Sequence, residues 1–236
     1  MNNQKVIRGI EKASGWDAEY KASSFLTQSF EPIQDVKDFF KYLKKNKSDV
    51  LEGIVVDLGC GNGRHAMYAS RNFGMYGFGY DISPAAIKEA QREQKLHEDI
   101  SCEFEVWNVA KKIPLNNAVA SVALDVTCSP SITSENIFNF FKEVARTMKH
   151  GGVLFSRQLI LDGDDNAKEL LKKSPFEDAY IHPTLQHLER VQTFDTITNL
   201  LSEFFEIAYS EKSYGYQTVG GKKFKRRYGV WYCVKK

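Results

Sequence analysis

A run of alternating glycines directly after a short apolar segment most constrains how this 236-residue chain can fold. Residues 54–66 read IVVDLGCGNGRHA, and their β-branched start predicts a buried strand. The following residues, RHAMYASRNF, have helical spacing and stop at Gly74. A glycine-rich turn between a strand and a helix brings a ligand close to bare backbone, where the first helical N–H groups are free donors. The sequence therefore predicts a small-ligand site at this turn.

Short apolar runs alternate with helical patterns beyond the turn. Strands are predicted at 75–81, 102–109, 118–127 and 151–160, from their apolar or alternating residues. A helix over 83–99 begins with Ser83 as N-cap and Pro84 at its first position. Two further helices are predicted, over 134–150, ending at Gly151 and Gly152, and over 195–204, with Asp195 as its cap.

The order of these elements predicts an α/β fold. Buried strands alternating with helices favour a parallel sheet that is covered by helices on both faces. The last two strands, 204–217 and 222–236, flank Gly220 and Gly221 and so predict a hairpin. The expected fold is a doubly wound, mostly parallel seven-stranded sheet that is Rossmann-like and ends in an antiparallel hairpin.

Composition limits the classes of protein to consider. The net charge is +2, so no overall attraction to nucleic acid or anionic membranes is expected. No apolar run is long enough to cross a bilayer, and the polar N-terminus lacks a signal-peptide core. The four cysteines have no metal-ligand or paired spacing, which favours free thiols in a reducing compartment and no metal site. We therefore expect a cytoplasmic protein without a membrane partner.

Two regions are predicted to cover the site. Residues 1–50 are expected to form an N-terminal helical segment over it, and residues 51–236 the main domain. Within the main domain, the polar stretch 161–194 has the length of a lid. Trp16 and Tyr20 are four residues apart, so on a helix they share a face that either roofs the site or packs on the domain.

The glycine turn discriminates between two ligand classes. Dinucleotide sites use G-x-G-x-x-G, but here the third glycine, Gly63, comes one residue early and Arg64 takes its place. The carboxylate of Asp57 beside the turn would also repel a pyrophosphate. It suits a ligand with positive charge, such as S-adenosylmethionine (SAM), which carries an ammonium and a sulfonium. An NAD-dependent dehydrogenase remains the alternative.

The segment VVDLGCGNG resembles the first motif, D-x-G-x-G-x-G, of class I SAM-dependent methyltransferases. The resemblance continues with DISPAAI after the second strand, EVWNVA after the third, and MKHGGVLF, where His150 replaces the proline of the family's K-P-G-G. It implies that Asp81 binds the ribose, that Asn108 reads the adenine, and that the glycines shape the methionine pocket. The implied cofactor-binding residues are Asp57, Leu58, Gly59, Cys60, Gly61, Gly63, Asp81, Ile82, Asn108, Val109 and Asp125.

The acceptor of the methyl group is expected outside the carboxyl end of the fourth strand, where ligands of open parallel sheets lie. Methyl transfer mainly requires alignment, and a base is needed only if the acceptor carries a proton. The substrate candidates are Trp16, Tyr20, Thr127, Cys128 and Tyr180, and the candidate bases are Asp125, His182 and His187. Asp125 is equally well explained as a cap for nearby backbone.

The sequence thus predicts an enzyme, a SAM-dependent methyltransferase acting on a small molecule. The alternatives are a non-catalytic SAM-binding module, the dehydrogenase, or an RNA or protein methyltransferase that uses the basic segment KKFKRR at 222–227. For this segment we favour a solvated hairpin edge in which lysines discourage aggregation. The missing N/D-P-P-Y/F motif weakens a nucleic-acid methylase.

Overall fold

The computed structural model describes residues 14–22, 29–219 and 222–236, except the side chains of 217–219 and 222–224. The described helices are α2 (Ser14–Ala22), α3 (Gln34–Asn46), η1 (Ser48–Glu52), α4 (Arg64–Phe73), α5 (Pro84–Gln94), η2 (Ser129–Ser131), α6 (Ile137–Thr147), α7 (Asp165–Lys172) and α8 (Phe194–Ser202). The strands are β1 (Ile54–Leu58), β2 (Tyr76–Asp81), β3 (Cys102–Val106), β4 (Ala120–Val126), β5 (Met148–Leu159), β6 (Ala179–Ile181), β7 (Leu188–Arg190), β8 (Phe205–Val219) and β9 (Lys222–Lys235).

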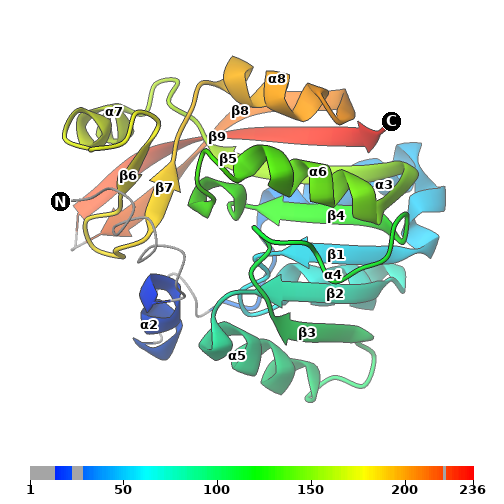
Figure 1. Ribbon diagram of the computed structural model, residues 1–236. Coiled ribbons are helices and arrows are strands. Elements are labelled where there is room, and N and C mark those ends of the chain that lie inside the picture. The colour runs from blue at the N-terminus through cyan, green and yellow to red at the C-terminus, as the bar shows by residue number, and fades with distance from the viewer. Residues whose placement is uncertain (1–13, 23–28, 220–221) are drawn as a thin grey trace.

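Seven strands form one twisted sheet in the order β3-β2-β1-β4-β5-β9-β8 (Figure 1). The first five strands are parallel, whereas β9 is antiparallel to both β5 and β8. The predicted fold class is therefore confirmed. The strand order reverses direction between β1 and β4, which is where ligands of doubly wound folds bind.

Helices cover both faces of the sheet because the central strands are buried on both sides. On one face, Val56 and Leu58 of β1 pack with α6 and α8, for example with Phe140. On the other face, Val55 of β1 packs with α3, including Phe39. Helix α3 is thus part of the core, although it lies in the predicted N-terminal segment. The boundary predicted at residue 50 stays a prediction.

The start of α5 forms as its sequence predicts. The Ser83 side chain accepts a hydrogen bond from the backbone N–H of Ala86 at 3.2 Å, and Pro84 occupies the first helical turn. This cap satisfies one of the free N–H groups of the helix start. Helix α4 likewise ends where expected, since Gly74 adopts a left-handed φ of 68°.

Two predicted element ends are wrong. The helix predicted over 134–150 ends at Thr147 rather than at the glycines, because Met148 already pairs with Ala120 in the sheet. The cap of the helix near 195 lies two residues earlier than predicted: it is Thr193, not Asp195, and its hydroxyl accepts from the N–H of Thr196 at 3.2 Å. In the first case a sheet contact overrides the local signal, and in the second a neighbouring residue provides the local cap.

The predicted insertion, 161–194, contains α7 and the two-stranded sheet β6-β7. Figure 1 shows this unit and α2 beyond the carboxyl ends of the parallel strands. The predicted Gly220–Gly221 turn lies outside the described residues. Among those described, no helix is long and apolar enough to span a membrane, and no group of three His, Cys, Asp or Glu side chains is arranged to hold a metal ion.

Candidate functional site

A cavity of about 390 Å³ opens at the carboxyl ends of β1, β2 and β4. This size is typical of small-molecule sites, which measure ~300–1,000 Å³. The predicted residues that line it are Trp16, Tyr20, Gly59, Cys60, Gly61, Asp81, Ile82, Asn108, Val109, Thr127, Cys128 and His187. Six predicted residues do not line the cavity, namely Asp57, Leu58, Gly63, Asp125, Tyr180 and His182. The structure thus brings most of the predicted site residues together from six separate parts of the chain.

Glycine is required at two positions of the turn that borders the cavity. Gly59 and Gly61 have left-handed φ values of 67° and 56°. A Cβ at Gly59 would lie 2.7 Å from the Cβ of Cys128, and one at Gly61 would overlap the Tyr20 hydroxyl. Side chains here would therefore clash with both the segment after β4 and helix α2, as well as strain the backbone.

Asp81, at the end of β2, ties the glycine turn to the start of α5. Its two carboxylate oxygens accept from the N–H of Gly61 at 2.9 Å and from the N–H of Ser83 at 2.8 Å. Burial raises the pKa of this carboxyl, although the two N–H groups act in the opposite direction. Asp81 lies in the cavity wall, so the same carboxylate that shapes the turn is available to a ligand there.

Asp57 is a buried carboxyl near the end of β1, beside the glycine turn. It is 1 % exposed, and neither of its oxygens has a hydrogen-bond partner among the described residues. Burial raises its pKa to about 7, although the nearby backbone N–H of Ala66 and the charge of Arg64 work against this. An uncompensated buried carboxyl is costly, and a cationic ligand group at the adjoining turn would relieve it. Asp57 does not line the cavity itself, so it would act on a ligand at the turn through its charge and not through direct contact.

The adenine-side residues also lie in the cavity wall, in the loop after β3. Asn108 and the buried Val109 line it together with Trp107, which sequence reasoning did not single out. The side-chain oxygen of Asn108 accepts from the N–H of Ala110 at 2.9 Å. Its amide group is therefore oriented by its own loop.

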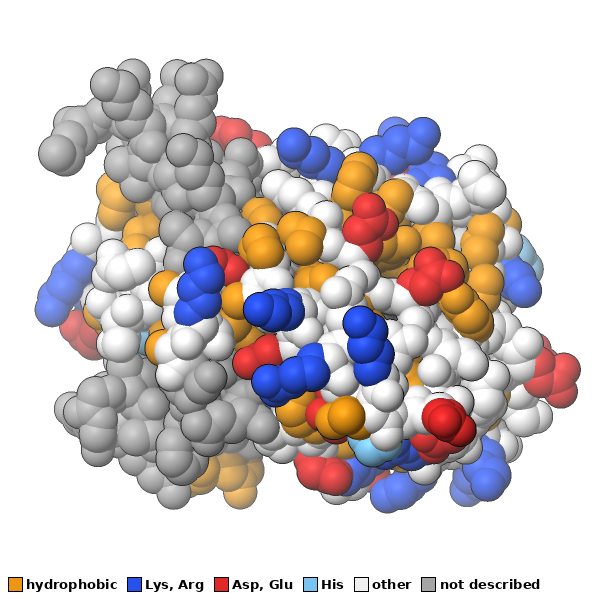
Figure 2. Space-filling view, turned by 90° about the horizontal axis from the view of Figure 1, so that it is seen from below, with side chains coloured by type: hydrophobic (Ala, Val, Ile, Leu, Met, Phe, Trp, Pro, Cys, Tyr) orange, Lys and Arg blue, Asp and Glu red, His pale blue; other side chains and the backbone are white. Residues whose placement is uncertain are grey.

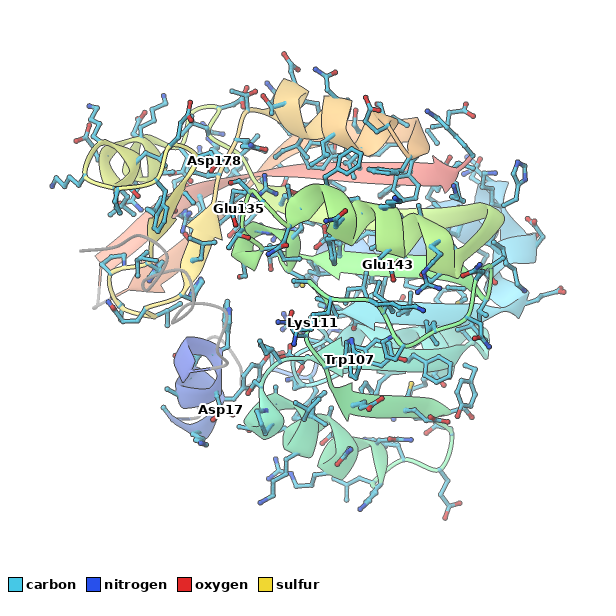
Figure 3. All side chains as sticks on the ribbon, in the orientation of Figure 1. Asp17, Trp107, Lys111, Glu135, Glu143 and Asp178 are labelled. Atoms are coloured by element: carbon cyan, nitrogen blue, oxygen red, sulfur yellow. The ribbon has the colours of Figure 1, made fainter. Side chains whose placement is uncertain are left out.

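Helix α2 forms one wall of the cavity through Trp16 and Tyr20. Asp17 fastens this helix to α5: one carboxylate oxygen accepts from the hydroxyl of Ser83 and from the N–H of Ala85, each at 3.0 Å (Figure 3). Lys21 pairs with Asp17 at 2.6 Å, and this contact is the main reason why the pKa of Asp17 is lowered. The α2 wall is thus attached to the helix that follows Asp81.

Replacing this attachment should weaken ligand binding more than folding. In Asp17→Ala, α2 loses its two contacts with α5, and a loss of about 1 kcal/mol corresponds to a roughly fivefold higher Kd for S-adenosylhomocysteine (SAH). Isothermal titration calorimetry measures this. Lys21→Ala is the control, because Lys21 touches Asp17 but not α5, and its Kd should stay within about twofold of native. Equal affinities for native protein and Asp17→Ala would contradict the prediction.

The segment after β4 carries unusual backbone. Thr127 has a φ of 59°, which is rare for a β-branched residue. Its N–H donates to the carbonyl of Arg157 at 2.8 Å, and its hydroxyl donates to the carbonyl of Val126 at 2.6 Å. Strained residues of this kind gather at binding sites. Thr127 and the neighbouring Cys128 both line the cavity.

Three predicted site residues form hydrogen bonds with other parts of the protein and do not line the cavity as ligand contacts. Asp125 accepts from the N–H and hydroxyl of Ser129 and from the hydroxyl of Ser156, at 2.7–2.9 Å, so both of its oxygens are occupied. His182 accepts the N–H of Leu185 at Nδ1, and the Tyr180 hydroxyl donates to a buried carboxylate. Of the capping and catalytic interpretations of Asp125, these contacts favour the capping one.

Sequence reasoning missed cavity residues that come from strands distant in the chain. Arg157 of β5 and Tyr228 of β9 lie against each other, with the guanidinium carbon 3.5 Å from the ring centroid. Arg157 also pairs with Asp35 of α3 at 2.7 Å. Glu189 of β7 is a further lining residue. No local pattern marks these residues, because only the sheet order places β5 next to β9.

Known proteins resemble this chain in sequence and in fold. Residues 55–152 match the family model described as a methyltransferase domain. The ribosomal protein L11 methyltransferase of Lachnospira eligens is 26% identical over 156 residues, 65% of this chain and 47% of that protein. The chain thus spans about half the length of this curated relative.

Solved structures share this fold at low sequence identity. A SAM-dependent methyltransferase from Methanosarcina mazei has a TM-score of 0.66 at 20% identity, over 77% of this chain and 92% of that one. A structure concerned with the conversion of a disulfide bond into a thioacetal group in echinomycin biosynthesis has a TM-score of 0.64 at 18% identity, over 95% and 92%. Residues 55–152 of this chain thus match a methyltransferase domain, and the chain shares the fold of solved SAM-dependent methyltransferases.

Proposed function

We propose that this protein is an enzyme that transfers a methyl group from SAM to a small-molecule acceptor. The observation that carries the proposal is the walled cavity, which continues from the glycine turn to Thr127, Arg157 and Tyr228. Helix α2 and the segment before β7 close its sides, which suits an acceptor that is enclosed rather than one presented on a large surface. The predicted cytoplasmic location remains part of this proposal.

Each part of the site has a role in the proposal. SAM supplies a methyl group that is activated by its sulfonium. Gly59 and Gly61 would hold the methionine part beside Asp57, Asp81 would bind the ribose, and Asn108 the adenine. This half of the site would also be shaped by the backbone or apolar contacts of five further residues: Leu58, Cys60, Gly63, Ile82 and Val109. The insertion at 161–194 and the segment 1–50 would enclose the acceptor, with Trp16, Tyr20, Thr127 and Cys128 near it.

A macromolecular acceptor is the second candidate, since the sequence relative is named as a methyltransferase of a ribosomal protein. One face of the molecule, shown in Figure 2, has Lys and Arg side chains interspersed with acidic ones. Such a mixed surface does not supply the single positive field that nucleic-acid binding uses. We therefore rank a protein acceptor above RNA and below a small molecule.

Thermal unfolding with separate ligands tests the cofactor. At 100 times its Kd, SAH should stabilise the fold by about 2.7 kcal/mol, which raises the Tm by about 5–10 °C for a protein of this size. NADH at the same concentration should leave the Tm unchanged. A strong rise with NADH and none with SAH would overturn the proposal. Mass spectrometry of SAM reactions with small molecules and with ribosomal protein then separates the two acceptor classes.

A further inference from the structure

One histidine in the cavity wall has a free ring nitrogen. His187 precedes β7 and lines the cavity, and its ring lies against Trp16 of α2 with the centroids 4.4 Å apart. Its Nδ1 atom is buried and has no hydrogen-bond partner among the described residues. A buried polar atom without a partner, in a residue that lines a cavity, calls for an explanation such as a bound water or a catalytic role.

The other ring nitrogen faces a carboxylate that is held in its charged form. Nε2 of His187 lies 3.5 Å from Oε1 of Glu189. Oε2 of Glu189 accepts from the Tyr180 hydroxyl at 2.6 Å and from Arg226 at 3.2 Å. Burial raises the pKa of Glu189, but His187 and the charge of Arg226 outweigh it and hold this pKa at about 2. The anion favours the neutral tautomer with its proton on Nε2, which leaves the lone pair on Nδ1.

The surroundings of His187 contain few other ionisable groups. Glu19 on α2 faces it, and burial raises the pKa of this carboxyl. His182 stacks on His187 with the centroids 5.5 Å apart, but its own Nδ1 already accepts backbone N–H groups. Arg226 and Tyr180 lie behind Glu189. Of these groups, Tyr180 and Arg226 contact Glu189, and none of the described residues is hydrogen-bonded to Nδ1 of His187.

The remaining cavity histidine lacks such support. His65, at the start of α4, also has a buried nitrogen without a partner among the described residues, but no carboxylate contacts its ring. Burial and the charge of Arg64 lower the pKa of His65 well below its ordinary value. Of the two histidines that line the cavity, only His187 has the oriented, charge-supported arrangement of a general base.

We propose that His187 is a general base for an acceptor hydroxyl, and that Glu189 is its positioning residue. This inference rests on the proposed function. The O–H bond of the acceptor breaks, its proton passes to Nδ1, and its electron pair forms the new bond to the methyl carbon. The pair of the broken carbon–sulfur bond remains on the sulfur of SAH. Trp16 and Tyr228 in the same wall favour an acceptor whose hydroxyl is carried by an aromatic ring.

Nitrogen-15 NMR of the histidine rings tests the arrangement without an acceptor. In the SAH-bound protein, neutral His187 should carry its proton on Nε2, and Glu189→Gln should convert this signal to a mixture of both tautomers. His187→Gln identifies the signal by its loss. The control His97→Gln, at a half-buried residue that does not line the cavity, should leave it unchanged. A proton on Nδ1 in the native protein, or an unaltered signal in Glu189→Gln, overturns the proposal.

Turnover with three probes tests the chemistry. Catechol carries hydroxyls, thiophenol a thiol, and pyridine a nucleophilic nitrogen without a proton. Native protein should methylate catechol in preference to pyridine. His187→Gln should lower kcat for catechol by ~10²–10⁴, while the Kd for SAH stays within twofold. Retention of more than a tenth of kcat, or preferred transfer to thiophenol or pyridine, overturns it.

The two proposals fail in different ways. If SAH does not bind, the proposed function fails. If SAH binds but the tautomer or the kcat of His187→Gln is unchanged, only the role of His187 fails. If none of the probes is methylated, the tautomer measurement alone decides.

Discussion

Asp81→Ala is expected to raise the Kd for SAH by about 100-fold or more. Its carboxylate accepts from the backbone N–H groups of Gly61 and Ser83, and it lies in the cavity wall. Hydrogen bonds to a charged group contribute about 1.5–3 kcal/mol each, and the proposed ribose contact provides two of them. A loss of about 3 kcal/mol or more corresponds to this change in Kd. Isothermal titration calorimetry at constant ionic strength measures it.

Two further variants separate binding from folding. Asp81→Asn keeps the shape and one oxygen acceptor for the turn, so it should fold like native protein yet bind SAH at least tenfold more weakly. Asp99→Ala removes an exposed carboxylate that pairs with Arg71 and should leave the Kd unchanged. If Asp81→Ala, with a native circular dichroism spectrum, binds SAH within threefold of native protein, Asp81 does not hold the ribose.

Arg226→Met is expected to lower stability by about 3–5 kcal/mol, because it leaves two buried carboxylates without their cation. Arg226 is 1 % exposed and contacts Asp164 at 3.0 Å and Glu189 at 3.2 Å. For a chain of this length the loss corresponds to a Tm lower by roughly 6–20 °C. Differential scanning calorimetry at neutral pH measures it.

The neighbouring basic residue provides the control. Lys225 is exposed over the Tyr214 ring, so Lys225→Met should change stability by less than about 0.5 kcal/mol.

The pH dependence of stability provides a second test of the role of Arg226. Because the pKa of Glu189 is lowered from 4.5 to about 2, its ion-pair stabilisation is fully present above pH 4.5 and is lost as the pH falls through 2. The difference in stability between native protein and Arg226→Met should therefore become smaller as the pH approaches 2. A Tm for Arg226→Met within 2 °C of native would contradict the prediction.

Local signals predicted well those elements that local contacts determine. The Ser83 cap, the stop at Gly74 and the bare turn at Gly59 and Gly61 each depend on a few adjacent residues, and the structure shows all of them. The end of α6 was predicted wrongly because the pairing of Met148 with Ala120 spans 28 residues of sequence and overrides the glycine stop.

Charge patterns were less informative, because partners of a buried charge can lie anywhere in the chain. The segment KKFKRR was interpreted as a solvated edge, and this is wrong at Arg226, whose carboxylate partners lie 62 and 37 residues away. Glu189 escaped notice for the same reason: its significance comes from His187 and Arg226 together.

Helix α2 is attached on both sides of the cavity, through Asp17 to α5 and through the ring of Trp16 to His187. Release of either attachment would widen access to the glycine turn, whereas the sheet beneath would stay in place. The turnover rate is then expected to depend on how often α2 detaches, so that release of the product SAH, and not methyl transfer, limits kcat.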